Sequence, residues 1–228
     1  MSKKHLKRLN TPTTWNIKRK ENKYIKRPYP GAHSFNDGMP LSIFLKDLLN
    51  FAKTNKEVKN ILNKQEVLID GIKRKDSKFI VGLMDVISLP YLKENFRVIL
   101  NKKGKLDIIK INESESKLKI CKIIGKSVCE GKLQINLFDG RNILAEKKDC
   151  KVGDSVLVEL PELKIKEIIK LENGSMVLIV DGKKSGKIAV IEDIKDNIMK
   201  CRDDEGSFET SKAYAFAIGT DKSLIKIE

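Results

Sequence analysis

The chain has 228 residues, 40% of them apolar, which is enough to build one large domain or two to three small ones and excludes disorder throughout. Lysine and arginine outnumber aspartate and glutamate by 46 to 31, a net charge of +15. This excess favours a polyanion, either nucleic acid or an anionic lipid surface, over a pocket for a charged substrate. Apolar runs such as residues 176–180 are far shorter than the roughly 18 residues of a membrane span, so we expect a soluble protein that is not secreted.

Cysteine and histidine usage argues against metal sites and nucleophilic catalysis. The cysteines lie at Cys121, Cys129, Cys150 and Cys201, a spacing without zinc-type CxxC pairs or a dense disulfide framework, so we expect reduced thiols. Both histidines, His5 and His33, are near the N-terminus. Because a Ser/His/Asp or Cys/His set needs a histidine base in the folded core, we expect no catalytic site, no metal and no cofactor.

Residues 1–30 carry ten basic side chains and one acid, Glu21, and so supply nine of the fifteen net positive charges. Aromatic residues and prolines are interspersed, and the apolar residues keep no helical or strand period. This pattern predicts an arm without a fold of its own, which binds phosphates, stacks its rings on unpaired bases and becomes ordered on nucleic acid. The alternative is a solvated basic tail or localisation signal; the prolines disfavour an amphipathic membrane anchor.

Two helices are predicted after the arm. Apolar residues recur at helical spacing over residues 41–52, which indicates a helix of about three turns. Thr54 and Glu57 have the spacing of a capping box and predict a second, shorter helix. Strands are expected at residues 65–70, which end in the turn signal Asp70-Gly71, and at residues 79–87.

The chain from Pro90 onward has the pattern of short strands separated by glycine-containing turns, which suggests a small barrel. Strands are expected at residues 97–100, 106–111, 120–124, 134–138, 142–145 and 155–160. The acids and arginine near these turns, Asp139, Arg141, Asp149 and Asp154, fit local turn hydrogen bonds better than an active site.

The last section predicts two strands, 176–180 and 188–191, around a loop with Gly182, Gly186 and three lysines. Backbone N–H groups and ammonium groups of such a loop can approach phosphates, although its spacing is not that of a P-loop. Strands at 199–202 and 208–211, joined by an acidic turn at 203–206, could close a five-stranded SH3-like barrel.

Four parts of the chain carry a common resemblance: residues 5–9 with Trp15 and 27–33; stretches within 40–71 with 82–87; residues 139–142 with 153–155; and residues 174–191. In this order they resemble the N-terminal signature, the S-four-type RNA-binding domain, the central domain and the KOW motif of the archaeal and eukaryotic small-subunit ribosomal protein four of the e type. The resemblance implies a structural, non-enzymatic protein of the small subunit, cytoplasmic and ribosome-bound. Ribosomal RNA is the implied partner, with other ribosomal proteins as candidate neighbours and neither a membrane nor a small-molecule substrate.

We therefore expect an α+β, multi-domain chain: a basic N-terminal extension (1–38), an S-four-type α-α-β RNA-binding domain (39–95), a central β barrel-like domain (96–170) and a C-terminal SH3-like KOW barrel with its tail (171–228). The alternative is a free-standing RNA-binding module of an RNA-modification enzyme or of a translation or transcription factor. It is disfavoured because only about 20 residues stay unassigned, too few for an enzyme core. An enzyme within the central barrel would need a pocket of carboxylates, and the sequence shows only turn-type acids.

The predicted RNA-binding residues come from the arm, the helix module and the last loop. They are Lys3, Lys4, His5, Lys7, Arg8, Trp15, Lys18, Arg19, Lys20, Lys23, Lys26, Arg27, His33, Lys46, Lys53, Lys56, Lys59, Arg74, Lys75, Lys183, Lys184, Gly186 and Lys187. Because only seven of the 46 basic residues are arginine, we expect phosphate and shape recognition, with base reading limited to Arg8, Trp15, Arg19 and Arg27.

Overall fold

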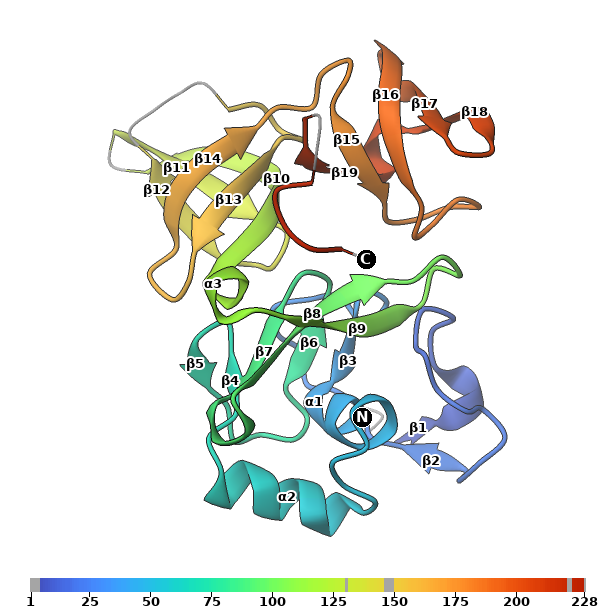
Figure 1. Ribbon diagram of the computed structural model, residues 1–228, viewed down its shortest axis with the longest axis vertical. Coiled ribbons are helices and arrows are strands. Elements are labelled where there is room, and N and C mark those ends of the chain that lie inside the picture. Colours follow the sequence, from blue (N-terminus) through green and yellow to red (C-terminus); the bar gives the residue numbers. More distant parts are fainter. Residues whose placement is uncertain (1–4, 130, 146–149, 221–222, 228) are drawn as a thin grey trace. The chain divides into compact units, whose positions relative to one another are not determined.

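The computed structural model describes residues 5–129, 131–145, 150–220 and 223–227 (Figure 1). Strands outnumber the few short helices and form several sheets. The chain divides into two compact units: the first comprises Met1–Ile99 and Lys105–Ser116, and the second Leu100–Gly104 and Lys117–Glu228. Within the described ranges, no helix is long and apolar enough to cross a membrane.

The described residues of the N-terminal arm are folded as part of the first unit. It contains β1 (Leu6–Lys7), η1 (Arg8–Asn10) and β2 (Tyr24–Ile25), and β1 pairs with β2. Trp15 is only 1% exposed, its ring centre lies 5.4 Å from that of Phe35, and the Leu106 N–H donates to the Thr14 carbonyl at 2.7 Å. The prediction that the arm has no fold before it meets nucleic acid is therefore wrong for its described residues, because Trp15 is buried and the arm hydrogen-bonds to the rest of the unit.

The first predicted helix is shorter than expected and changes geometry along its length. It consists of α1 (Leu41–Ile43) and the π-helical η2 (Phe44–Leu48), in which the Leu49 N–H donates to the Phe44 carbonyl five residues earlier, at 2.8 Å. The chain then leaves the helix at Asn50, whose φ is 56°. Left-handed backbone there ends the helix before the predicted third turn.

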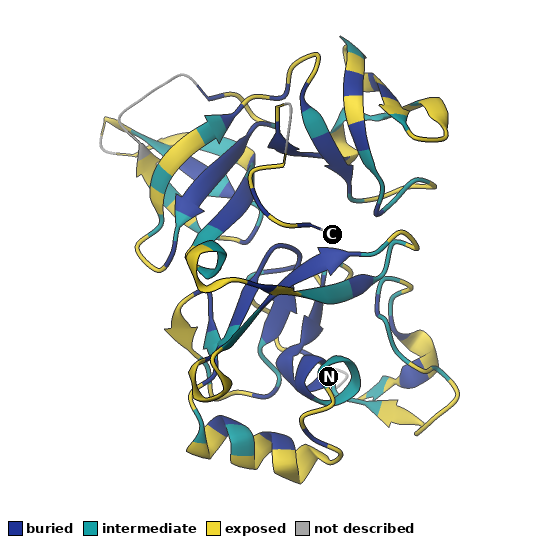
Figure 2. Ribbon diagram, in the orientation of Figure 1, coloured by how far each residue is buried: buried dark blue, intermediate teal, exposed yellow. Residues whose placement is uncertain are grey.

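The second helix forms as predicted, as α2 (Asn55–Lys64). The Thr54 hydroxyl accepts from the Glu57 N–H at 3.3 Å, and the Glu57 carboxylate accepts from the Lys53 N–H at 2.8 Å, so both side chains cap the start of the helix. Val58 and Leu62 are buried, which leaves the lysines on the opposite face in solvent (Figure 2).

Two sheets complete the first unit. A small one pairs β3 (Gly38–Pro40) with β6 (Ile80–Gly82). The larger one has the order β5 (Ile72–Lys73), β4 (Leu68–Ile69), β7 (Val86–Leu89), β8 (Glu94–Leu100) and β9 (Leu106–Ile111). The short segments η3 (Pro90–Leu92) and α3 (Glu113–Ser116) lie between β7 and β8 and after β9.

The sheets of the first unit correct two expectations. Residues 79–87 do not form one strand, because Met84 has a φ of 66° and the chain turns between β6 and β7, which join different sheets. The hairpin of β8 and β9 forms as predicted, but it pairs with β7 rather than with the strands that follow (Figure 1). The first unit consequently extends to Ser116, beyond the boundary expected at residue 95.

The second unit contains two five-stranded antiparallel sheets. The first has the order β12 (Asn142–Ala145), β11 (Lys132–Leu137), β10 (Leu118–Cys129), β13 (Ser155–Glu159) and β14 (Lys164–Ile169). The second has the order β18 (Gly206–Ser211), β17 (Ile198–Asp203), β16 (Ile188–Lys195), β15 (Met176–Ile179) and β19 (Ala215–Gly219), with η4 (Lys212–Tyr214) before β19. The sequence had predicted neither β14 nor β19.

A partly buried lysine links the two sheets of the second unit. Lys122 on β10 donates from Nζ to the carbonyls of Ala213 and Ala215, at 2.6 Å each. Burial lowers the pKa of Lys122 to about 8. Phe138 and Phe216 add an edge-to-face contact, with ring centres 6.3 Å apart.

Candidate nucleic-acid interface

Three lysines of the first unit come together although they lie far apart in sequence. Lys26 follows β2, Lys59 lies on the exposed face of α2, and Lys78 precedes β6. Burial lowers the pKa of Lys26, and repulsion from Lys59 and Lys78 lowers it further, while Asp76 opposes the shift. We call these three residues the lysine cluster; a phosphate bound among them would relieve their repulsion.

The arm positions the lysine cluster through contacts with the segment before β6. The Tyr29 N–H donates to the Lys78 carbonyl at 3.1 Å, and Lys26 Nζ donates to the Ser77 hydroxyl at 3.0 Å. Lys78 Nζ lies 4.6 Å from the centre of the Tyr29 ring. Sequence reasoning missed Lys78 as a site residue, since its relation to the arm appears only once the arm is docked.

Two arginines assigned to base reading hold the arm together. Arg8 is 3% exposed and donates from Nη1 to the Lys18 carbonyl at 2.9 Å. Arg19 donates to the carbonyls of Pro12, at 2.8 Å, and of Leu9 and Thr11, at 3.3 Å each. Their guanidinium groups thus satisfy carbonyl groups of the arm outside its one strand pair, and base reading by them stays a prediction.

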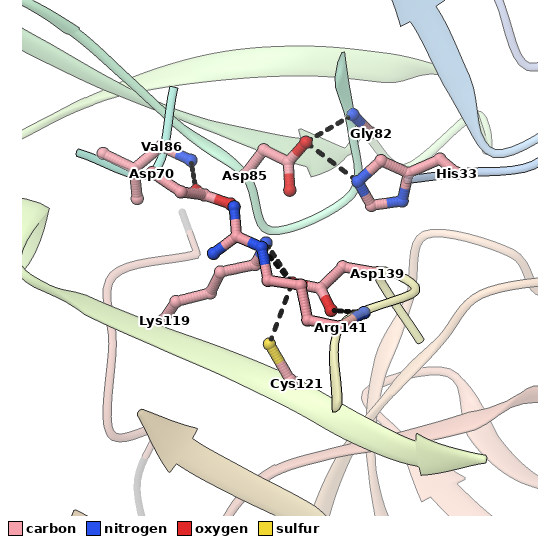
Figure 3. Close-up of polar contacts among 9 residues, drawn as sticks. All are labelled: His33, Asp70, Gly82, Asp85, Val86, Lys119, Cys121, Asp139 and Arg141. Carbon is pink, nitrogen blue, oxygen red and sulfur yellow. Dashed lines mark hydrogen bonds and ion pairs between the residues drawn. The ribbon is translucent and has the colours of Figure 1, made fainter. Parts of the chain in front are cut away.

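His33 and Trp15 are also interior residues rather than surface contacts. His33 Nε2 lies 2.8 Å from Asp85 Oδ2, which also accepts from the Gly82 N–H at 2.9 Å (Figure 3). A Cβ atom on Gly82 would lie 2.3 Å from His33 Cγ, so only glycine leaves room for the imidazole. Burial therefore removes the expected stacking of Trp15 on bases and the expected RNA contact of His33.

The loop between β15 and β16 has its charges paired within the chain. Lys184 lies 3.6 Å from Asp203 and 3.2 Å from Glu205, and Lys187 lies 3.4 Å from Asp203 and also contacts Glu205. The hydrogen bond to Glu205 raises the pKa of Lys187, and the hydrogen bonds from Lys187 and Lys184 lower the pKa of Glu205. We call this arrangement the paired loop.

Gly186 in the paired loop is buried and packs against another part of the chain, whereas the sequence predicted that its backbone approaches RNA phosphates. Its φ is 84°, and a Cβ atom there would lie 1.8 Å from the Asn101 carbonyl oxygen. The glycine is needed for packing against the turn at Asn101. The expected approach of its backbone to RNA is corrected accordingly.

The remaining predicted residues fall into three groups. Lys3 and Lys4 lie outside the described residues. Lys46, 3.7 Å from Asp47, and Arg74, 4.4 Å from the centre of the Phe79 ring, are partly buried. The exposed group is His5, Lys7, Lys18, Lys20, Lys23, Arg27, Lys53, Lys56, Lys75 and Lys183.

Asp139 and Asp154, near the turns of the central sheet, serve the fold, and Asp149 lies outside the described residues. Asp139 accepts from Lys119 Nζ at 2.9 Å and from the Arg141 N–H at 3.2 Å (Figure 3). Burial alone would raise the pKa of Asp139, but the charges of Lys119 and Arg141 hold it below its ordinary value. Asp154 accepts from the Lys151 and Leu171 N–H groups, at 2.6 and 3.0 Å. Among the described residues, no three His, Cys, Asp or Glu side chains are arranged to hold a metal ion.

Comparisons with known proteins match nearly the whole chain. The family model described as ribosomal family S4e matches residues 92–165, and that of the RS4NT domain matches residues 2–36. The small ribosomal subunit protein eS4 of Methanocella arvoryzae is 40% identical over 97% of this chain and 97% of its own length. That of Methanosphaera stadtmanae is 41% identical over 99% of this chain and 96% of its own length.

The chain belongs to the S4e family of ribosomal proteins. The crystal structure of the 30S ribosomal protein S4e from Thermoplasma acidophilum is similar, with a TM-score of 0.70 and 31% identity, over 81% of this chain and 96% of that one. Within this S4e chain, the RS4NT match covers most of the arm that packs onto the first unit. The S4e match runs from Leu92 to Ile165, across the change from the first unit to the second.

Proposed function

We propose that this chain is a structural constituent of the small ribosomal subunit, which binds ribosomal RNA and helps to fold and stabilise it during translation. The single observation that carries the proposal is the similarity to small ribosomal subunit proteins eS4 over nearly the whole chain. The lysine cluster supplies a surface for RNA, because Lys59 and Lys78 lie close enough to Lys26 to lower its pKa. Phosphate oxygens are the natural counter-charge for such a group. The names of the relatives at 40% and 41% identity support the ribosome as the location, in the cytoplasm.

The proposed RNA surface of the first unit is narrower than the set predicted from sequence. It consists of the lysine cluster with exposed neighbours from the arm and from α2: His5, Lys7, Lys18, Lys20, Lys23, Arg27, Lys53, Lys56 and Lys75. Lysines dominate this surface, so it would recognise phosphates and shape more than base edges. Lys183 is the exposed basic residue that the paired loop would contribute from the second unit.

We also propose that the finer architecture follows the family resemblance. The segment 39–95 would be the S-four-type domain, which its two helices and the turn at Asp70-Gly71 support. The sheet of β15 to β19 would be the KOW-type SH3-like barrel, since five antiparallel strands carry a glycine- and lysine-containing loop between the first two. The role is structural, and other ribosomal proteins would be its neighbours.

Co-sedimentation tests the proposed function directly. A tagged copy expressed in the source cells should sediment with the small subunit in a sucrose gradient at moderate salt and should be released as salt rises, because phosphate contacts are salt-dependent. The tag on an unrelated protein of similar charge controls for adventitious adsorption. Recovery of the tagged chain only at the top of the gradient would contradict ribosome binding and favour a free-standing RNA-binding module.

A further inference from the structure

The two-stranded ribbon of β1 and β2 has one face toward the unit and one toward solvent. Leu6 pairs with Ile25, and Lys7 pairs with Tyr24. Residues paired across an antiparallel ribbon point to the same face, and successive residues alternate. Leu6 and Ile25 are partly buried whereas Lys7 and Tyr24 are exposed, so lysine and tyrosine share the solvent face.

Tyr24 is an exposed ring surrounded by groups that attract phosphate. Tyr24 is 53% exposed. The His5 ring centre lies 5.6 Å from the tyrosine ring centre, tilted by 48°, and Lys23 Nζ lies 5.5 Å from that centre. With Lys7 opposite on the neighbouring strand, the aromatic ring has basic side chains on both strands of the ribbon.

The other aromatic rings of the arm are engaged in the fold. Trp15 is buried, and Phe35 packs against it. Tyr29 takes part in positioning the lysine cluster, since its hydroxyl accepts from Lys78 Nζ at 3.3 Å. Tyr24 is therefore the arm ring whose described contacts come from the exposed side chains of His5 and Lys23.

We propose that Tyr24 is a stacking site for one unpaired RNA base, with His5, Lys7 and Lys23 binding the phosphates on either side of that nucleotide. The inference rests on the proposed RNA-binding function and adds to it the class of nucleotide recognised. An aromatic face accepts any unpaired base but cannot reach a base inside a duplex. Stacking releases no counterions, so the tyrosine and the lysines contribute to affinity in separable ways.

Binding of the full chain to two RNA probes tests this site. The probes are a short RNA hairpin with a single-stranded loop and the fully paired duplex of the same stem, each followed by fluorescence anisotropy over a salt series. Tyr24→Leu should weaken binding to the hairpin about tenfold, in line with one lost base stack, without changing the slope of log K against log salt. Binding to the duplex should stay as in the wild type, and Tyr24→Phe should bind both probes normally.

Two further variants guard against indirect effects. Tyr91→Ala removes a tyrosine of the first unit that is 73% exposed and should alter binding to neither probe. Tyr24→Trp places an indole at the site, and its fluorescence should be quenched by the hairpin and not by the duplex. Circular dichroism of each variant reports whether the fold is kept. If Tyr24→Leu fails to fold, Tyr24→Phe still tests the site, because it keeps an aromatic ring in the ribbon.

The possible outcomes distinguish failure of the stacking site at Tyr24 from failure of RNA binding as a whole. If the wild-type chain binds neither probe, the proposed RNA-binding function fails. If the wild type binds the hairpin and Tyr24→Leu binds it equally well, the stacking site is overturned while RNA binding stands. A loss for Tyr24→Leu that is equal on hairpin and duplex would also overturn stacking, because a duplex offers no unpaired base.

Discussion

Lys26 and Lys184 both belong to the basic residues expected to bind RNA, yet their surroundings are opposite. In the lysine cluster of the first unit, burial and repulsion from Lys59 and Lys78 lower the pKa of Lys26. In the paired loop of the second unit, Lys184 and its neighbour Lys187 lie against two carboxylates, and the pKa of Lys187 is raised. The first group gains from an incoming phosphate, whereas the second already holds its counter-charges.

Formal charge is therefore a poor measure of the charge that a surface offers to a partner. A phosphate that approaches the paired loop competes with the carboxylates of Asp203 and Glu205 for the same ammonium groups. At the lysine cluster a phosphate removes repulsion that exists in the unbound protein. We therefore expect the first unit to dominate RNA affinity, although the loop has the richer glycine and lysine pattern.

The largest expected effect is a loss of stability when Gly186 of the paired loop is replaced. Gly186→Ala should destabilise the protein by ~4 kcal/mol, since it combines strain at positive φ with overpacking against the Asn101 carbonyl. Urea unfolding measures the loss. Gly174→Ala is the matched control: its φ is 87°, with no heavy atom within 4 Å of the added Cβ, so only ~1–2 kcal/mol is expected. Equal losses in both variants would mean that Gly186 is not needed for packing.

The next effect is on RNA affinity. Replacement of all three residues of the lysine cluster by glutamine should weaken binding to an RNA hairpin about a hundredfold at low salt and lower the slope of log K against log salt by roughly 2 to 3 units. The matched triple replacement in the paired loop, Lys183, Lys184 and Lys187 to glutamine, should lower that slope by less than about one unit. If the loop variant lost as much RNA affinity and salt slope as the cluster variant, the paired loop would bind phosphates as strongly as the lysine cluster.

Lys122 contacts only other parts of the fold, and its burial should make the stability of the protein depend on pH. Burial lowers the pKa of Lys122 to about 8 in the folded chain, whereas an unfolded lysine titrates near its ordinary 10.5. Between these values the unfolded chain holds a proton that the folded chain has released, so stability should rise with pH, by ~2 kcal/mol. Urea unfolding from pH 7 to 10.5 measures this rise.

The Lys122→Met variant should lose that rise, because it has no proton to release. Lys183→Met, at an exposed position, is the control for loss of one charge without loss of the contact between the sheets. Burial would not disfavour the charged form of Lys122 if the unfolding free energy of the wild type stayed flat over this pH range. The same conclusion would follow if the unfolding free energy of Lys122→Met still rose.

Local sequence rules predicted the elements whose signals lie within a few residues. The cap of Thr54 and Glu57 forms three residues apart, and Gly71 and Gly140 take the positive φ of their turns. Short-range hydrogen bonds and glycine conformations of this kind depend little on distant packing. The same holds for the short strands predicted at residues 120–124, 155–160 and 176–180, which lie within or overlap β10, β13 and β15.

Contacts between distant segments could not be predicted from the sequence. His33 and Asp85 are 52 positions apart, and Lys187 and Asp203 are 16 apart, so neither pairing leaves a local pattern. Composition showed the arm as basic and aromatic, which is equally typical of an unfolded RNA-binding tail. The burial of Trp15 and the hydrogen bond from the Leu106 N–H to the Thr14 carbonyl distinguish a docked arm from such a tail.

The smallest expected effect comes from removing the counter-charges of the paired loop. Asp203→Asn with Glu205→Gln should release Lys184 and Lys187, raise affinity for the RNA hairpin a few-fold and steepen the salt slope by roughly 1 to 2 units. Asp196→Asn with Glu209→Gln changes the net charge equally, from other positions in or beside the same sheet, and should leave the slope nearly unchanged. If both pairs of substitutions raise affinity alike, net charge explains the gain. If the gain persists when Lys184 and Lys187 are glutamine, the carboxylates do not act by occupying those lysines.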